Sequence, residues 1–347
     1  MIALTVAECD MPLTRPFRVA SFTLTSAYTV VARVSWQGLV GYGESAPLAR
    51  YGDSVASIMA YFATYVVPPD AGPFSASRML ANVPRAARCA LDVAMWDLRG
   101  KVLGVSVGDL LGLEGLLPPP SSLTVPIEDD LATVIERVHS LGDVPAIKVK
   151  VGAAGCDDVA LIEAIRSIYT GAIRIDANEG WTAEQSVRIL HELARFGVEW
   201  CEQPIKAGQP HQLRWIAERS SIPLIADEDA VEASQLQVLH GCVYGINVKL
   251  AKCGGLGAAQ TMIATARALN FKVMIGCMAE SSILATAAAH IAPLADWLDI
   301  DGPTMLAHDP FSGVRFEGGT LVMPHGPGLG VAPIKTLAIE SESRVGT

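Results

Sequence analysis

Residues 147–150 read IKVK, a short apolar run that ends in charged residues, and five similar runs follow it along the chain. These read IDAN (175–178), CEQP (201–204), IADE (225–228), NVK (247–249) and DID (299–301). Neighbouring runs among the first five lie roughly 25 residues apart, a spacing that suits a strand followed by a crossover helix. We therefore expect one site assembled from the ends of several parallel strands.

Strand-like runs alternate with stretches of helical length and period over this part of the chain. Residues 183–196 and 257–269, for example, have the length and spacing of helices. Eight strands alternating with helices predict an α/β fold with a parallel barrel, whose active site lies at the carboxyl ends of the strands. The predicted strands are residues 122–127, 146–151, 173–177, 199–203, 223–227, 245–250, 272–277 and 297–301.

Residues 1–117 have a different pattern and predict a separate α+β domain. Residues 30–34 and 40–43 are expected to form two strands joined by a turn at Gln37 and Gly38. Residues 83–102 have helical spacing, with small apolar residues on one side. The N-terminal part of the chain therefore does not belong to the repeating barrel pattern.

Three consecutive prolines, residues 118–120, predict a stiff connector between the two domains. The barrel is then expected to span residues 118–305. Residues 306–347 contain short strands and the glycine turn GPGLG at 326–330, a pattern too irregular for another barrel unit. We expect this last segment to return to the N-terminal domain.

Composition and charge exclude several classes of partner. The chain has 347 residues, a net charge of -10 and no long run of Lys or Arg, so neither nucleic acid nor an anionic membrane surface is an expected partner. The apolar stretch 283–298 is interrupted by His290, Pro293 and Asp296 and suits a buried helix and loop better than a membrane span. No secretory signal is expected either, because Glu8 follows too early.

The seven cysteines are scattered and include no C-x-x-C pair. An odd number of scattered cysteines suits small, buried, reduced thiols rather than a disulfide framework. A soluble protein of the cytoplasm is the resulting expectation.

Three acidic residues end neighbouring strands: Asp176, Glu202 and Asp227. Carboxylate oxygens without an accompanying His or Cys suit Mg²⁺, and equally Mn²⁺, better than zinc. The alternative is a structural acidic cluster that pairs with lysines. Glu228 should face the opposite way because side chains alternate along a strand, so we do not expect it to be a ligand.

Two lysines end strands that should face each other across the barrel, Lys150 on the second strand and Lys249 on the sixth. Such a pair is suited to remove a proton from one face of a carbon and return it to the other. A lysine acts as a base at neutral pH only if its pKa is lowered, and neighbouring Lys148 and the metal would supply this by like-charge repulsion. Lys252 is the alternative base.

The motif order K-x-K, D-x-N, E-Q-P, A-D-E and N-x-K-L-x-K-x-G-G resembles the muconate-lactonizing branch of the enolase superfamily over essentially the whole chain. This resemblance implies a modified (β/α)7β barrel capped by an α+β domain built from both termini. It also implies removal of a proton α to a carboxylate that Mg²⁺ binds. Lys150 and Lys249 would be the acid/base groups, Lys148 would tune Lys150, and the metal ligands would be Asp176, Glu202 and Asp227.

The eighth strand ends in Asp299-Ile300-Asp301-Gly302-Pro303, which resembles the D-x-D signature of dipeptide epimerases. Two carboxylates there would bind the ammonium group of a dipeptide. Pairing of both with lysines, or capping of a loop, is the alternative. The stretches 276–278 (GCM) and 50–53 (RYGD) also resemble this branch. The substrate-binding residues expected from the resemblance are Asp299, Asp301, Leu24 and Met278.

One departure from the family pattern concerns substrate choice. Members that act on Ala-Glu carry an arginine in the first capping loop, whereas residues 21–28 contain none. We therefore expect a dipeptide whose second residue has an uncharged side chain. The expected reaction is inversion of the α-carbon of the C-terminal residue by a two-base 1,1-proton transfer, in a homo-oligomeric enzyme.

Other functions remain open at this point. Muconate cycloisomerase, o-succinylbenzoate synthase and N-acylamino acid racemase share the superfamily chemistry, but their substrates have no free ammonium group. A catalytically silent relative with a binding or structural role is the alternative of a different class. The presence of both lysines and all three carboxylates argues against it.

Overall fold

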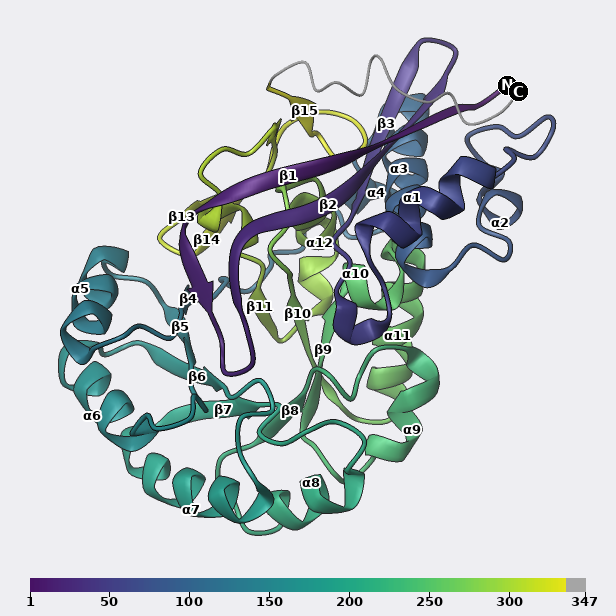
Figure 1. The fold of residues 1–347 in the computed structure, drawn as a ribbon. Helices are drawn as coiled ribbons and strands as arrows, with labels where there is room; N and C mark the ends of the chain where they lie inside the picture. The colour runs from purple at the N-terminus through teal and green to yellow at the C-terminus, as the bar shows by residue number, and fades with distance from the viewer. Residues whose placement is uncertain (335–347) are drawn as a thin grey trace.

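Eight parallel strands form the barrel in the computed structural model, which describes residues 1–334 (Figure 1). Each strand lies beside its neighbours in chain order, and Ser122 N donates to Leu298 O at 2.9 Å, which brings the last strand beside the segment that leads into the first. The predicted α/β barrel is confirmed. Its strands are β4 (Leu123–Val125), β5 (Ala146–Lys150), β6 (Ala172–Asp176), β7 (Val198–Glu202), β8 (Leu224–Ala226), β9 (Gly245–Lys249), β10 (Lys272–Gly276) and β11 (Trp297–Asp299).

Helices surround the barrel, and several begin at a residue that suits a helix start. Asp130, Asp157 and Thr182 each accept a hydrogen bond from a backbone N–H of the first turn, which satisfies a donor that the helix itself leaves free. The barrel helices are α5 (Leu131–Leu141), α6 (Asp158–Ile168), α7 (Ala183–Leu193), α8 (Pro210–Ala217), α9 (Leu236–Leu239), α10 (Leu250–Cys253), α11 (Leu256–Ala268) and α12 (Ser282–Ile291).

The apolar stretch at 283–298 begins as helix α12, whose ten residues are all buried. A helix that is apolar all round must be covered on every side, and α12 packs against both the barrel and the N-terminal domain. None of the helices between residues 1 and 334 has both the length and the apolar character that crossing a membrane requires. All seven cysteines are free thiols, as expected from their spacing, but the expectation that they are buried is wrong for Cys156, which is exposed.

The N-terminal domain is an antiparallel sheet covered by helices. Glycines at 41 and 43 let α3 pack directly on β3, since a Cβ at Gly43 would lie 2.0 Å from Ala90 O. Gln37 and Gly38 form the predicted turn, both with positive φ. Its elements are β1 (Ala3–Arg18), β2 (Thr23–Trp36), β3 (Leu39–Ser45), η1 (Ala49–Tyr51), α1 (Val55–Thr64), α2 (Ala76–Met79), α3 (Arg85–Leu103) and α4 (Val107–Leu110).

The hairpin of β1 and β2 extends from this domain over the mouth of the barrel, so the domain acts as a cap (Figure 1). Its register shifts between Pro12 and Phe17, and Ile127 N donates to Arg18 O at 3.1 Å, which fixes the end of β1 on the barrel. The sequence did not predict β1. This strand positions the residues of the hairpin tip above the ends of the barrel strands.

The C-terminal segment contacts the cap as well as the barrel. Leu306 forms a bridge with Leu13, Val107 N donates to Gly328 O at 2.8 Å, and Leu329 N donates to Asp97 Oδ1 at 2.8 Å. Residues 335–347 lie outside the described residues. The two boundaries between the three predicted segments stay predictions. The segment contains η5 (Gly302–Met305), β12 (Phe311–Ser312), β13 (Arg315–Glu317), β14 (Thr320–Val322) and β15 (Ala332–Pro333).

Candidate active site

Strand register brings the charged strand ends to one level of the barrel. Lys150 is opposite Asp176 in the β5–β6 ladder, and Asp176 is opposite Glu202 in the β6–β7 ladder. On the other side, Lys249 and Asp299 are each opposite Gly276 of β10. The carboxyl ends of the strands therefore carry a ring of lysines and carboxylates, as the six sequence runs predict.

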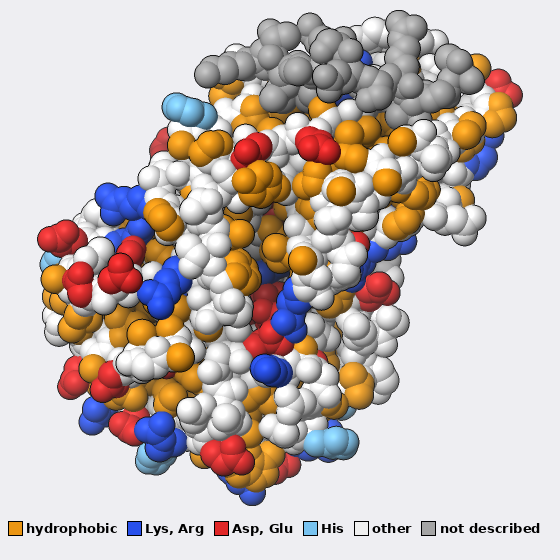
Figure 2. Space-filling model, viewed as in Figure 1, with side chains coloured by type: hydrophobic (Ala, Val, Ile, Leu, Met, Phe, Trp, Pro, Cys, Tyr) orange, Lys and Arg blue, Asp and Glu red, His pale blue; other side chains and the backbone are white. Residues whose placement is uncertain are grey.

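A cavity of about 390 Å³ lies between this ring and the cap. Figure 2 shows acidic and basic side chains in a hollow near the centre of this face, with hydrophobic side chains above them. Eight of the ten predicted site residues line it: Leu24, Lys148, Lys150, Asp227, Lys249, Met278, Asp299 and Asp301. The other two, Asp176 and Glu202, are fully buried beneath the cavity.

The three predicted metal ligands each pair with a lysine. Lys150 Nζ lies 2.6 Å from Asp176 Oδ2, and Lys249 Nζ lies 2.8 Å from Asp227 Oδ2. Lys148 Nζ lies 3.2 Å from Glu202 Oε2. Within residues 1–334, no three acidic, His or Cys side chains are already arranged as a metal centre. These ion pairs account for that, because each carboxylate is turned toward an ammonium group.

Burial and neighbouring charges shift the pKa values of these carboxylates in different directions. Burial, together with the nearby Asp176 charge, raises the pKa of Glu202 to about 7. Burial also acts to raise the pKa of Asp227, but Lys249 and Lys252 lower it by more, so its pKa is below the ordinary value. Like charges in a dry site repel strongly, so this cluster favours an added cation.

The lowering of a lysine pKa by Lys148 and a bound metal stays a prediction, and the protein groups alone shift the pKa of Lys249 the other way. Burial lowers the pKa of Lys249, but Asp227 and Glu202 raise it well above the ordinary value. The repulsion from Lys148 is present, yet the facing carboxylates outweigh it. Lys249 is therefore held as an ammonium group, which is the form that can donate a proton.

The alternative base, Lys252, has a structural position instead. Its side chain is buried and does not line the cavity. The ammonium group donates to the backbone oxygens of Asp227, Ala230 and Asn247 at 2.6, 3.1 and 2.9 Å, and also to the Asp227 carboxylate. Lys252 thus fixes the turn after β8, and of the two lysines Lys249 is the one that lines the cavity.

Four buried oxygen atoms around the site accept no hydrogen bond from the described residues: Asn178 Oδ1, Glu228 Oε2, Asn247 Oδ1 and Asp299 Oδ1. Buried acceptors are normally satisfied, and a group of unsatisfied ones indicates a missing donor or cation. Together with the three carboxylates, this all-oxygen set fits a hard divalent ion such as Mg²⁺. Asp176, Glu202 and Asp227 are the residues that would hold it.

The orientation predicted for Glu228 is wrong. Strand alternation would turn it away from the site, yet its side chain lines the cavity beside Asp227. The reason is that β8 ends at Ala226, so alternation no longer applies at residue 228. Asn178 Nδ2 donates to Glu228 Oε1 at 3.3 Å and fixes its orientation.

Asp299 and Asp301 both line the cavity but have different partners. Asp299 Oδ2 accepts from Lys148 Nζ in a short contact, which leaves Asp299 Oδ1 free. Asp301 accepts from Thr124 N at 2.7 Å and from Thr124 Oγ1 at 3.0 Å. Burial and the neighbouring Asp299 raise the pKa of Asp301 to about 7. Of the two residues, Asp299 therefore pairs with a lysine, as the alternative interpretation expects, but its Oδ1 atom has no partner among the described residues.

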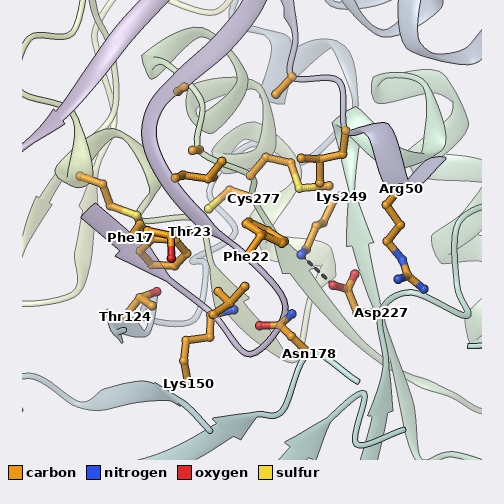
Figure 3. A pocket seen from close by; sticks show the side chains of 18 of the residues that line it. Phe17, Phe22, Thr23, Arg50, Thr124, Lys150, Asn178, Asp227, Lys249 and Cys277 are labelled. Carbon is orange, nitrogen blue, oxygen red and sulfur yellow. Dashed lines mark hydrogen bonds and ion pairs between the residues drawn. The ribbon is translucent and has the colours of Figure 1, made fainter. Parts of the chain in front are cut away.

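The cap supplies mostly apolar walls to the cavity. Phe17, Phe22 and Leu24 of the hairpin line it, and the Lys150 ammonium lies 5.9 Å from the centre of the Phe17 ring (Figure 3). Met278 adds a flexible apolar surface from the barrel. No arginine among residues 1–28 lines the cavity, in agreement with the arginine-free loop in the sequence.

Sequence reasoning missed the polar residues that orient the predicted ones, chiefly Thr124 and Asn247. Asn247 Nδ2 donates to Glu202 Oε1 at 2.6 Å, and a Cβ at Gly276 would lie 2.5 Å from Asn247 Oδ1. Asn247 is two residues before Lys249 on β9, so strand alternation was a usable signal for it. Thr124 carried no comparable signal in the sequence.

Fold and site together define a capped barrel with lysines and a carboxylate cluster at the strand ends. Residues 130–336 match the family model of the enolase C-terminal domain-like proteins. Residues 1–112 match that of the mandelate racemase / muconate lactonizing enzyme N-terminal domain. The chain belongs to the mandelate racemase/muconate lactonizing enzyme family of the enolase superfamily, as its motifs predict.

Similar proteins are named dipeptide epimerases. The chain is 35% identical over 336 residues to the L-Ala-D/L-amino acid epimerase of Pedosphaera parvula, which covers 92% of this chain and 95% of that one. It is 33% identical to the hydrophobic dipeptide epimerase of Roseobacter litoralis, over 91% of this chain and 94% of that one. It is 32% identical to the L-Ala-D/L-Glu epimerase of Bacteroides thetaiotaomicron, over 94% and 86%.

Solved structures show the same relationship. The substrate-liganded L-Ala-D/L-Glu epimerase of Bacillus subtilis superposes with a TM-score of 0.87 at 28% identity, over 95% of this chain and 98% of that one. The dipeptide epimerase of Enterococcus faecalis V583, complexed with Mg and L-Leu-L-Tyr, also gives a TM-score of 0.87 at 28% identity, over 95% and 99%.

Proposed function

We propose that this protein is a Mg²⁺-dependent dipeptide epimerase that inverts the α-carbon of the C-terminal residue. The observation that carries the proposal is the meeting, in one cavity, of two lysines from β5 and β9 with an Asp pair after β11. Lys150 and Lys249 supply proton transfer, and Asp299 with Asp301 supplies an ammonium site. The names of the similar proteins support the same reaction.

The carboxylates of Asp176, Glu202 and Asp227 would hold the metal. Bound there, Mg²⁺ would polarise the substrate carboxylate and stabilise the negative charge that develops when the α-proton leaves. All three carboxylates are buried and the cap covers the strand ends, so the metal would lie at the closed end of the cavity. A dry site strengthens every charge interaction within it.

Lys150 and Lys249 extend toward the same space from different strands (Figure 3). In one direction of the reaction, one lysine takes the α-proton as a neutral amine while the other donates a proton to the opposite face as an ammonium. The roles reverse in the other direction, as inversion without a net change of protonation requires. Lys148, which pairs with Glu202 and Asp299, connects the proton-transfer site to the ammonium site.

The ammonium group of the substrate finds an acceptor in Asp299 Oδ1, the carboxylate oxygen left free by Lys148. Asp301, oriented by Thr124, adds a second carboxylate beside it. The apolar hairpin wall then favours an uncharged second side chain. Use of Mn²⁺, a homo-oligomeric state and a cytoplasmic location stay predictions from the sequence.

Replacing Asp299 with Asn tests the ammonium site. Asp299→Asn removes the negative charge that receives the ammonium group, so we expect kcat/KM for a free dipeptide to fall by about 10²-fold, the order of a lost charged contact. The measurement is kcat/KM of the wild type and of Asp299→Asn for the free dipeptide and for its N-acetylated form, which has no ammonium group. The loss should be larger for the free dipeptide. The muconate cycloisomerase, o-succinylbenzoate synthase and N-acylamino acid racemase alternatives require activity to be nearly unchanged.

A further inference from the structure

Arg50 is a cation of the cavity wall that the proposed reaction does not use. Among residues 1–334, four cationic side chains line the cavity, and three are the lysines of the barrel. Arg50 comes instead from η1 of the cap, and Figure 3 shows it extending alongside the Lys249–Asp227 pair. A guanidinium group in this position is a ready receptor for a carboxylate.

The carboxylate of Glu179 already binds this guanidinium group. Its carboxylate lies in the loop after β6 and binds both terminal nitrogens of Arg50, with an Nη2–Oε1 distance of 2.5 Å. The Glu179 side chain is 9% exposed, whereas that of Arg50 is 41% exposed. The acidic partner is thus the more fixed member of the pair, and the cation is the member nearer to solvent.

The loop holds Glu179 in place independently of Arg50. Ala207 N donates to Glu179 Oε1 at 2.6 Å, and Glu179 N donates to Gln203 O at 2.8 Å. Glu179 has φ 66° and the preceding Asn178 has φ 39°, a left-handed backbone that residues other than glycine rarely adopt. Such a backbone persists only where the surroundings enforce it, so the carboxylate is presented in a fixed direction.

The ion pair also crosses from the cap to the barrel. In the described part of the chain, it is the one side-chain bond that joins residues 47–53 to a barrel loop, because Arg85 binds Tyr51 and Asp53 within the cap. A partly exposed ion pair contributes little to folding stability. The main effect of Glu179 is therefore to neutralise the charge of Arg50, and its contribution to folding stability is smaller.

We propose that Glu179 determines substrate choice by occupying Arg50, so that the pair excludes dipeptides with an acidic side chain on the C-terminal residue. This inference rests on the proposed dipeptide epimerase function. An acidic side chain that reaches this wall meets apolar residues, the nearby Glu228 and a guanidinium already bound to a carboxylate. It has to displace Glu179, which Ala207 N keeps in place.

The test compares two substrates with three variants. Glu179→Gln retains an oxygen that accepts from Ala207 N but removes the charge, which frees Arg50. We expect kcat/KM for L-Ala-L-Glu, relative to that for L-Ala-L-Leu, to rise at least tenfold in Glu179→Gln. In Arg50→Gln this ratio does not rise above the wild-type value, because the guanidinium was already occupied and its removal leaves the Glu179 carboxylate uncompensated. In the double variant Arg50→Gln/Glu179→Gln we expect no such rise in the ratio.

Three outcomes would overturn the inference. If Glu179→Gln lowers kcat/KM for both dipeptides alike, the pair acts only to hold the cap loop. If the double variant keeps the gain for L-Ala-L-Glu, the change does not act through Arg50. Preference of the wild type for L-Ala-L-Glu would also contradict it. These outcomes differ from failure of the proposed function, in which the wild type epimerises neither dipeptide, and a thermal melt checks that each variant is folded.

Discussion

Lys150→Met abolishes epimerisation but leaves proton exchange on one substrate epimer. Methionine has a similar volume without the amine, so the cavity shape is kept while one acid/base group is lost. Loss of a general acid/base group lowers the rate by about 10²- to 10⁴-fold. Lys249 still reaches its own face of the α-carbon, so exchange of the epimer whose α-proton faces Lys249 continues. Lys249→Met should give the opposite preference.

The measurement is α-proton exchange in D₂O, followed by NMR for each epimer separately. Lys206→Met, at an exposed position away from the cavity, is the matched control and should retain wild-type rates. Loss of exchange for both epimers in each lysine variant would argue against one base per face. Retention of epimerisation by Lys249→Met would return Lys252 to consideration.

Glu202→Gln weakens metal binding and lowers activity with it. The amide keeps an oxygen toward Asn247, which donates to Glu202 Oε1, but it removes one of three anionic ligands. We expect Mg²⁺ affinity to fall by about 10- to 100-fold and kcat by more than 10²-fold, since the metal stabilises the developing charge.

Thermal melts with and without Mg²⁺ measure this effect apart from turnover. A ligand that binds the folded state raises Tm, so Mg²⁺ should stabilise the wild type at a concentration about 10- to 100-fold lower than that needed to stabilise Glu202→Gln. Glu218→Gln, at an exposed position after α8, should behave like the wild type. An unchanged Mg²⁺ response in Glu202→Gln would show that the metal binds elsewhere.

The strand-end residues could be predicted because strands obey simple rules. Side chains alternate, parallel strands end on one side of a barrel, and Lys150, Asp176 and Glu202 are consequently at one level. The apolar runs marked all eight barrel strands for the same reason. The roles of these residues remain part of the proposal.

Loops and pairings could not be predicted in the same way. Glu228 lies in a turn where alternation has ended, and its direction depends on Asn178. Arg50 and Glu179 are 129 residues apart in the sequence, so their pairing depends on how the cap lies on the barrel. The raised pKa of Lys249 likewise depends on the facing Asp227. The order of motifs alone does not show that Asp227 affects this pKa more than Lys148 does.

We propose that the lysines in this cavity remove and return the α-proton of the C-terminal residue of a dipeptide. Incubation of the wild type with Mg²⁺ and a library of L,L-dipeptides in D₂O tests it directly, by mass spectrometry and NMR. The proposal predicts incorporation of one deuterium at that α-carbon, with formation of the L,D-epimer, for dipeptides with uncharged second residues. A chelator should stop both. Absence of exchange across the whole library would contradict the claim.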